Sequence, residues 1–287
     1  MKAINQDQNQ VTKTWLNRQL RMIERHRGED ALAILGPIQS GLEHAVRNAL
    51  ESIPKRSDRL LVILDTPGGH VEVVVRLVTI MRKLFQSVSF LVPDRAMSAG
   101  TVLVMSGDAI LMDYFSCLGP IDPQVKKGDT WVPALSYLRQ FEALIEKSRN
   151  GTLTVAELAL LKQLNLAELH QIELQGQLSV DLIKRWLVQY KFKDWTETTR
   201  SKTAVTQKLK EDRADQIAKI LNQHDRWHSH GRGIGMDVLT SEEIRLKIDD
   251  YSADKKFHGM VWDYYTCLSD FASRNKLPGF VHTRSFF

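Results

Sequence analysis

The stretch Arg59-Leu60-Leu61-Val62-Ile63-Leu64-Asp65-Thr66-Pro67-Gly68-Gly69 decides the fold of this chain. Its unbroken aliphatic run is typical of a strand that is buried on both faces. The Pro-Gly-Gly turn ends that strand, and residues 71–85 follow as an apolar stretch of helical length. This helix is apolar nearly all round, so we expect it to be deeply buried. A strand, a turn and a helix in this order predict a parallel β-α unit.

The same unit recurs on both sides of this stretch. Apolar runs at 31–35, 88–92 and 109–112 predict three more strands, and short helices are expected to end near residue 52 and to span 99–105. After residue 133 the pattern predicts helices at about 133–149, 154–172, 179–190, 204–222, 239–247 and 254–274. We therefore expect an α/β fold with a core of repeated β-α units and a helical C-terminal region.

Composition excludes several classes of protein. The chain has 287 residues, of which 43% are hydrophobic and 25% charged, which excludes a mostly disordered or collagen-like chain. Two cysteines, Cys117 and Cys267, cannot form a disulfide framework or a four-cysteine zinc site. No apolar run approaches the ~18 residues of a membrane-spanning helix, and the first residues lack a signal-peptide core. These features predict a cytoplasmic protein.

The net charge of +5 comes from two peripheral segments. Residues 1–28 carry six basic and two acidic side chains, and residues 181–220 carry ten and six. A basic amphipathic helix at about 11–27 packs on the body or on a partner, or contacts a membrane surface. Nucleic acid is not an expected partner, because the basic residues are not interleaved with aromatic ones and match no nucleic-acid-binding module.

Two loops rich in small residues carry the candidate chemistry. In Asp65–Gly69 the adjacent glycines expose backbone N–H groups before a helix, which suits a phosphate or the oxyanion of acyl transfer, although a plain turn is the alternative. Neither a P-loop nor a Rossmann glycine pattern is present. In Arg95–Thr101, Ser98 stands between a strand and a helix with Ala96 and Gly100 around it. Small flanking residues are the steric requirement of a nucleophile elbow, and a helix cap is the alternative.

Three ordered motifs, at 64–69, 96–101 and 118–124, resemble the Clp-fold serine peptidases, and in particular the serine dehydrogenase proteinase group, which is related to signal peptide peptidase A. The resemblance extends to 227–234 and covers roughly residues 30–250. It implies a Clp/crotonase-like core, proteolysis without a cofactor, and Ser98 as the nucleophile. It also implies an oxyanion hole formed by the N–H groups of Gly68 or Gly69 and of Ala99.

The resemblance also suggests how the chain is divided. We expect an N-terminal basic helix at 1–28, a Clp-like serine peptidase domain at 29–250 that is rich in helices after about 133, and a C-terminal helix and tail at 251–287. Relatives with this core assemble into rings or stacked trimers, so the resemblance implies a homo-oligomer that acts on peptides or unfolded proteins. Peripheral contact with a membrane stays an open alternative.

The general base is the main question. Clp proteolytic subunits carry a histidine about 25 residues after the serine, where this chain has Ile121-Asp122-Pro123-Gln124. The signal peptide peptidase branch uses a lysine some 40–50 residues after the serine, and Lys147, which is 49 residues after Ser98, resembles it. We therefore predict a Ser98–Lys147 dyad. Such a lysine must be neutral, so burial must lower its pKa from about 10.4; a surface lysine is the alternative.

Other readings remain. His70, beside the double glycine, or His230, which matches a histidine of the family's later segment, are alternative bases, and Asp122 could orient a base or only form a turn. His228 and His230 lack a third metal ligand, so no metal is predicted. Two other classes of function stay open. One is an inactive structural or regulatory protein, in which Ser98 only caps a helix; the other is a crotonase-like acyl-CoA enzyme.

Overall fold

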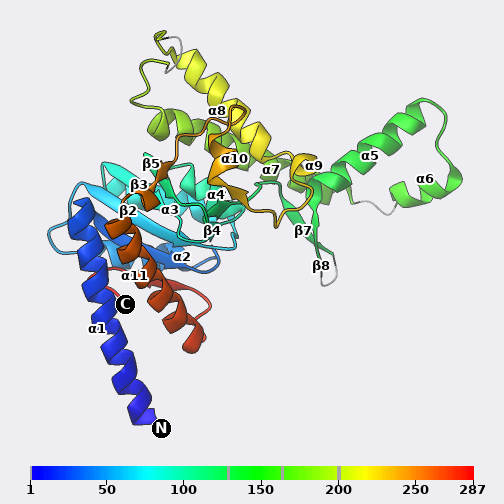
Figure 1. Ribbon diagram of the computed structural model, residues 1–287. Helices are drawn as coiled ribbons and strands as arrows, with labels where there is room; N and C mark the ends of the chain where they lie inside the picture. Colours follow the sequence, from blue (N-terminus) through cyan, green and yellow to red (C-terminus); the bar gives the residue numbers. More distant parts are fainter. Residues whose placement is uncertain (1, 128–129, 163–164, 199–201) are drawn as a thin grey trace.

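The computed structural model describes residues 2–127, 130–162, 165–198 and 202–287. A six-stranded sheet with the order β10-β5-β3-β2-β1-β11 forms its centre (Figure 1). All neighbouring strands pair in parallel except β11, which runs antiparallel to β1 at one edge. The strands are β1 (Asp30–Leu35), β2 (Arg59–Asp65), β3 (Ser87–Leu91), β5 (Ala109–Met112), β10 (Asp249–Asp250) and β11 (Phe280–His282). The predicted α/β fold is confirmed.

The deciding stretch explains why the sheet is covered on both faces. In β2, Leu60, Val62 and Leu64 belong to one hydrophobic cluster, whereas Leu61 and Ile63 belong to another. Successive side chains of a strand point to opposite faces, so an unbroken aliphatic run needs helices on both sides. One face packs on α2 (Leu42–Glu51), α3 (Val71–Leu84) and α4 (Ala99–Val104).

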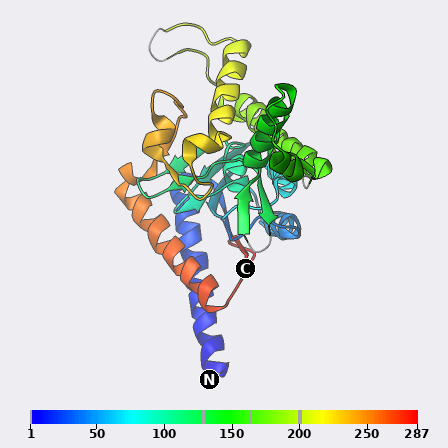
Figure 2. The same cartoon turned by 90° about the vertical axis from the view of Figure 1, so that its right-hand side faces the viewer.

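The opposite face packs on helices from the two ends of the chain. The helices α1 (Lys2–Arg27) and α11 (Lys255–Arg274) lie side by side against it (Figures 1 and 2). Leu16, Leu20 and Ile23 of α1 share the second cluster with Tyr264 and Leu268 of α11. Both terminal helices are therefore packed on the α/β body. Within the described residues, no helix combines the length and the apolar character needed to cross a bilayer.

One helix differs from its sequence-based expectation. The helix α3 is not buried all round, because Glu72, Arg76, Thr79 and Lys83 are exposed. Its buried side chains Val73, Val74, Leu77, Val78 and Met81 form one face toward the sheet. Val71 and Val75, which lie between these two faces, are only partly buried.

A small second sheet sits where the candidate loops begin. It contains β4 (Arg95–Ala96), β6 (Cys117–Leu118) and β9 (Ile234–Gly235), with β4 parallel and β9 antiparallel to β6. The register places Ala96, Leu118 and Ile234 side by side. An isolated bridge between Thr66 and Ala96 joins this sheet to the end of β2.

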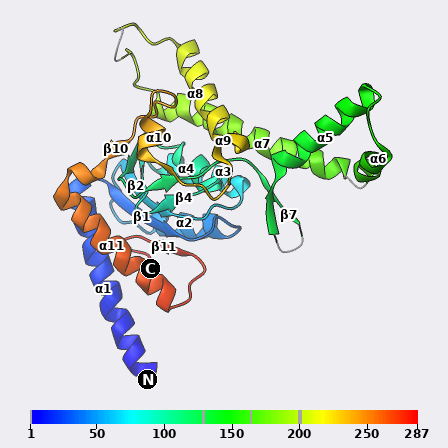
Figure 3. The same ribbon diagram turned by 45° about the vertical axis from the view of Figure 1, so that its right-hand side comes forward.

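The helical C-terminal region has two parts. The helices α5 (Ala134–Arg149) and α6 (Val155–Lys162) form an arm that projects from the α/β body, with the hairpin β7 (Gln124–Lys127) and β8 (Thr130–Pro133) at its base (Figures 1 and 3). The second part returns to the body: α7 (Leu166–Trp186), a π-helical turn at Leu187–Lys191, α8 (Gln207–Leu221), and the short helices α9 (His224–Trp227) and α10 (Met236–Thr240).

Three of the predicted helices have other bounds in the structure. The helix expected at 239–247 is the short helix α10, which ends at Thr240 because the backbone of Ser241 is no longer helical, with ψ 161°. The helix expected at 154–172 is two helices, because Asn165 caps α7 by accepting hydrogen bonds from the N–H groups of Ala167 and Glu168. The helix expected at 179–190 is the second half of α7 and its π-helical turn. A capping asparagine starts a new helix wherever its side chain satisfies the first free N–H groups.

Candidate active site

Ser98 occupies a strained turn between β4 and α4. Its backbone has φ 51° and ψ −115°, a conformation that a non-glycine residue rarely adopts and that costs about 1–3 kcal/mol. Ser98 holds the N-cap position of α4, yet its side chain makes no capping hydrogen bond. The hydroxyl is thus held at a sharp turn without serving the helix, which is the geometry expected of a nucleophile elbow.

The Gly68 loop lies directly against this serine. A Cβ atom added to Gly68 would stand 2.7 Å from the Met97 carbonyl oxygen and 2.9 Å from the Ser98 Cβ. Gly68 also has φ +101°, where glycine alone is comfortable. Gly100, on the serine's other side, is packed against the Thr66 methyl group, which a Cβ would meet at 2.4 Å. Both glycines are therefore required by the close approach of the two loops.

The three predicted oxyanion donors differ in their bonding. The Gly68 N–H donates to Thr66 Oγ1 over 3.0 Å. The Ile38 N–H donates a hydrogen bond to the Gly68 carbonyl, and the Ile38 carbonyl accepts one from the His70 N–H. The N–H of Gly69, which lies between these two residues, therefore points away from Ile38. Within the described part of the chain, the N–H groups of Gly69 and Ala99 meet no hydrogen-bond acceptor. Of the three predicted donors, Gly69 and Ala99 are therefore the two whose N–H groups have no acceptor among the described residues.

The small sheet brings a second pair of polar residues to the same edge. Ser98 follows the end of β4 and Asp122 follows the end of the parallel strand β6. His230 precedes the antiparallel strand β9, so it also lies beyond that edge. His230 Nδ1 and Asp122 Oδ1 are 2.9 Å apart, with the carboxylate fully buried and the imidazole side chain 17% exposed.

Thr101 ties the serine loop to the Asp122 segment. Its buried hydroxyl lies 2.8 Å from both the Ala96 and the Gly119 carbonyl oxygens, and it accepts the Gly119 N–H over 2.9 Å. The hydroxyl hydrogen serves one carbonyl at a time, so the two bonds share it. The end of β4 and the end of β6 are therefore held at a constant separation.

Lys147 lies elsewhere in the chain. It stands in the last turn of α5, at the far end of the arm, and its Nζ is 2.5 Å from Glu157 Oε1 (Figure 3). The side chain is 51% exposed, so the burial expected of a neutral lysine base is not found in this conformation. Within one chain, the fold does not bring Lys147 to the Ser98 loop. His70 precedes α3 as an exposed residue and makes no capping bond.

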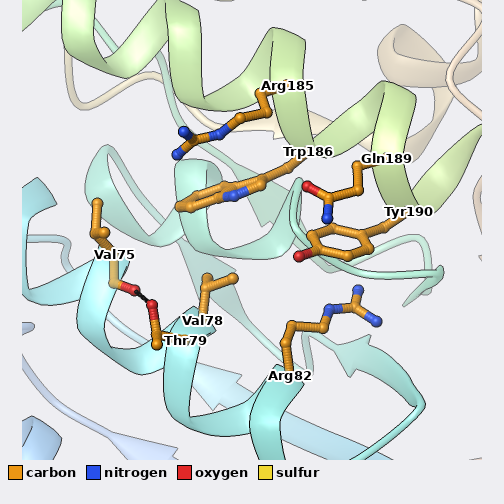
Figure 4. Close-up of a pocket in the computed structure, with 8 residues that line it drawn as sticks. All are labelled: Val75, Val78, Thr79, Arg82, Arg185, Trp186, Gln189 and Tyr190. Atoms are coloured by element: carbon orange, nitrogen blue, oxygen red, sulfur yellow. Dashed lines mark hydrogen bonds between the residues drawn. The ribbon is translucent and has the colours of Figure 1, made fainter.

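A pocket next to α3 is separate from these residues. A pocket of about 230 Å³ lies between α3 and the end of α7, and Trp186 and Tyr190 form one wall of it (Figure 4). Arg82 is already bound there, since it donates to Asp108 over 2.6 Å and its guanidinium stacks 3.6 Å from the Tyr190 ring centroid. Among the described residues, no group of three or more histidine, cysteine or acidic side chains is placed to hold a metal ion.

Sequence reasoning missed the Asp122–His230 pair. The two residues are 108 positions apart, and the strand that joins them, β9, has only two residues. The available signals were an aspartate between two prolines and a histidine in an H-x-H pair, each of which has an ordinary structural explanation. Only the register of the small sheet shows that they meet.

Comparison with known proteins identifies the family of this chain. A model of the ClpP-like SDH-type serine proteinases matches residues 17–174, more than half of the chain. Two uncharacterized proteins of Methanocaldococcus jannaschii, MJ0137 and MJ1495, are 30% and 28% identical over 40% and 49% of this chain. The matched segments cover 38% and 51% of those relatives, so this chain spans at most about half of their length.

A solved structure of a membrane-bound stomatin-specific protease, the 1510-N protein in a serine-to-alanine mutant form, has 13% sequence identity and a TM-score of 0.46. That comparison covers 79% of this chain and 82% of the other. The family match is the stronger finding, because it includes β1 to β5 and both loops around Ser98. The resemblance seen in the three sequence motifs is therefore confirmed, and this chain belongs to the ClpP-like SDH-type serine proteinase family.

Proposed function

We propose that this protein is a serine peptidase that hydrolyses peptide bonds through Ser98. The observation that carries the proposal is the backbone of Ser98, which is held at positive φ with no capping bond while Gly68 packs against its Cβ. Backbone strain of this kind is concentrated at active sites and ligand clamps. A helix-capping serine needs neither the strain nor the neighbouring glycine.

The reaction we propose is a two-step acyl transfer. The Ser98 oxygen attacks the peptide carbonyl carbon, and the N–H groups of Gly69 and Ala99 stabilise the oxyanion that forms. The amine product leaves with a proton from the base, and water then hydrolyses the acyl-enzyme ester. Gly68 contributes by its missing side chain, since its N–H is bonded to Thr66.

For the base we propose His230, with Asp122 as the residue that orients it. An imidazole whose Nδ1–H donates to a buried carboxylate keeps Nε2 free of hydrogen, which is the tautomer that accepts a proton from a serine. The 2.9 Å contact between His230 and Asp122 supports this assignment, as does their position at the Ser98 edge of the small sheet. The alternative is Lys147 supplied by the arm of a neighbouring copy.

The test is covalent labelling by a fluorophosphonate probe together with cleavage of an unfolded protein. The wild type should label and cleave, and Ser98→Ala should do neither. His230→Gln and Asp122→Asn should each lower the rate by on the order of 10²–10⁴-fold, the usual contribution of a general base, while Lys147→Met keeps it. The opposite result, with loss only in Lys147→Met, would transfer the role of base to the lysine.

The same experiment, with a coenzyme A thioester added as a third substrate, separates the other functions. A folded wild type that takes no label would be a structural or regulatory member of the family. A protein that labels at Ser98 but cleaves thioesters of coenzyme A and no peptide would be an acyl-CoA enzyme that shares the oxyanion geometry.

We also propose that a second copy of the chain covers the arm. No residue of α6 is buried, although the helix is mostly apolar, and Val155, Leu158 and Leu160 are exposed at 87%, 44% and 56%. Exposed apolar side chains gathered on one short element are typical of an interface. Sedimentation should show a homo-oligomer for the wild type and a smaller species for the Leu158→Lys, Leu160→Lys double variant. Equal sizes would reject this interface.

A further inference from the structure

A tyrosine of the C-terminal helix reaches both loops of the candidate active site. Tyr265, on α11, is almost fully buried, and its hydroxyl donates to Asp65 Oδ2 over 2.8 Å. The same hydroxyl oxygen lies 3.4 Å from Asp94 Oδ2. The tyrosine is 200 residues from Asp65 and 171 from Asp94 in sequence, so only the packing of α11 on the sheet brings them together.

Each of the two carboxylates stands at the start of one loop. Asp65 is the last residue of β2 and leads directly into Thr66–Gly69. Asp94 follows β3 and leads into Arg95–Ser98. The backbones of the two loops are already joined, because the Thr66 N–H donates to the Arg95 carbonyl and the Met97 N–H to the Thr66 carbonyl. A change in the spacing of the carboxylates therefore acts on both loops together.

The two carboxylates are electrostatically unfavourable neighbours. Burial raises the pKa of Asp65, and the adjacent charge of Asp94 raises it further, whereas the hydrogen bond from Tyr265 lowers it. Arg95 offers only a long contact, with its Nε 3.8 Å from Asp65 Oδ1. Another titratable group near the pair is the half-buried thiol of Cys117, whose pKa is raised by burial and then by Asp94. The Tyr265 hydroxyl is thus the closest donor to the pair.

We propose that Tyr265 is a positioning residue for Ser98: its hydroxyl keeps the Asp65 and Asp94 carboxylates together and so holds the Gly68–Gly69 turn against the serine. The inference rests on the proposed peptidase function. Without the hydroxyl, two partly buried carboxylates are left side by side with no close donor, and their repulsion separates the segments that begin at each of them. A displacement of about 1 Å at a reacting group costs on the order of 10²-fold in rate.

The helix supplies a matched control next to this residue. Tyr264 is fully buried, and its hydroxyl is 2.7 Å from His282 Nδ1, a group that belongs to neither loop. Tyr265→Phe and Tyr264→Phe each remove one hydroxyl and leave the ring packing. We expect Tyr265→Phe to lower the maximal rate of fluorophosphonate labelling by on the order of 10–100-fold, with the probe's dissociation constant nearly unchanged. Tyr264→Phe should lose stability and keep the labelling rate.

Two further readouts separate positioning from general destabilisation. Asp94→Asn added to Tyr265→Phe replaces the repelling charge with an amide donor, so it should restore most of the labelling rate. The labelling defect of Tyr265→Phe, expressed as the ratio to wild type at the same pH, should shrink as the pH falls and one carboxylate gains a proton. Wild-type labelling by Tyr265→Phe, an equal loss in Tyr264→Phe, or no rescue would each overturn the proposal.

Hydrogen exchange tests the same geometry without any activity. Amides of residues 66–69 and 95–99 should exchange faster in Tyr265→Phe than in the wild type or in Tyr264→Phe. If the wild type takes no label but this difference is found, the proposed peptidase function fails and the positioning by Tyr265 stands. Unchanged exchange in these loops would reject the positioning.

Discussion

Replacing Gly68 with alanine tests the close approach of the two loops. A Cβ at this position would stand 2.7 Å from the Met97 carbonyl oxygen and 2.9 Å from the Ser98 Cβ, well inside the ~3.5–4.0 Å at which carbon atoms attract. The loops must separate by on the order of 1 Å to accept it, which predicts about 10²-fold slower labelling of Ser98.

The expected loss of stability has two parts. Backbone strain destabilises an L-residue at φ +101° by about 1–2 kcal/mol, and an added methyl group in a packed site costs about 1–3 kcal/mol more. Gly41→Ala is the control that carries only the backbone strain, because Gly41 has φ +99° and no atom lies within 4 Å of an added Cβ. Gly41→Ala should therefore lose about 1–2 kcal/mol and label normally.

The assay is urea unfolding of both variants, followed by fluorophosphonate labelling under conditions in which each is fully folded. The difference between the free energies of unfolding of Gly68→Ala and Gly41→Ala measures the steric cost alone. If the two variants lose equal stability and Gly68→Ala labels at the wild-type rate, the loop does not press on the serine and the reasoning is refuted.

Three further predictions concern stability. Burial lowers the pKa of His282 from 6.5 to about 3, so the neutral form is favoured in the folded protein. The contribution of neutral His282 to the free energy of unfolding is complete above about pH 6.5 and falls by up to about 1.4 kcal/mol per pH unit as the pH drops toward 3. Urea titrations of His282→Phe should lack this slope. Phe90→Ala, at a fully buried position of β3, should cost about 3–5 kcal/mol in the same assay, whereas the half-exposed Phe115→Ala should cost far less. In the Leu158→Lys, Leu160→Lys background, Lys147→Met should leave the thermal midpoint unchanged, because within one chain the ion pair with Glu157 is exposed; a clear fall in that background would contradict this exposure.

Local sequence was sufficient for the four central strands of the main sheet and for the two loops. Continuous apolar runs of four or more residues, bounded by turn residues, are enough to identify β1, β2, β3 and β5. Adjacent glycines indicate the turn that follows β2. The strands of the small sheet have two residues each, so they carry no pattern to detect. The terminal strand β11 was missed for a related reason: its three residues become a strand only by pairing with β1.

The sequence by itself determined the α/β class, the family motifs and the presence of a serine between small residues, because each of these depends on neighbours along the chain. Tertiary structure alone decided which side chains from distant parts of the chain meet. It placed Lys147 at the end of an exposed arm, paired His230 with Asp122, and set Tyr265 between two loops. The physical reason is that burial and hydrogen bonding between distant residues depend on how helices and strands pack, and the identity of a side chain does not encode its surroundings.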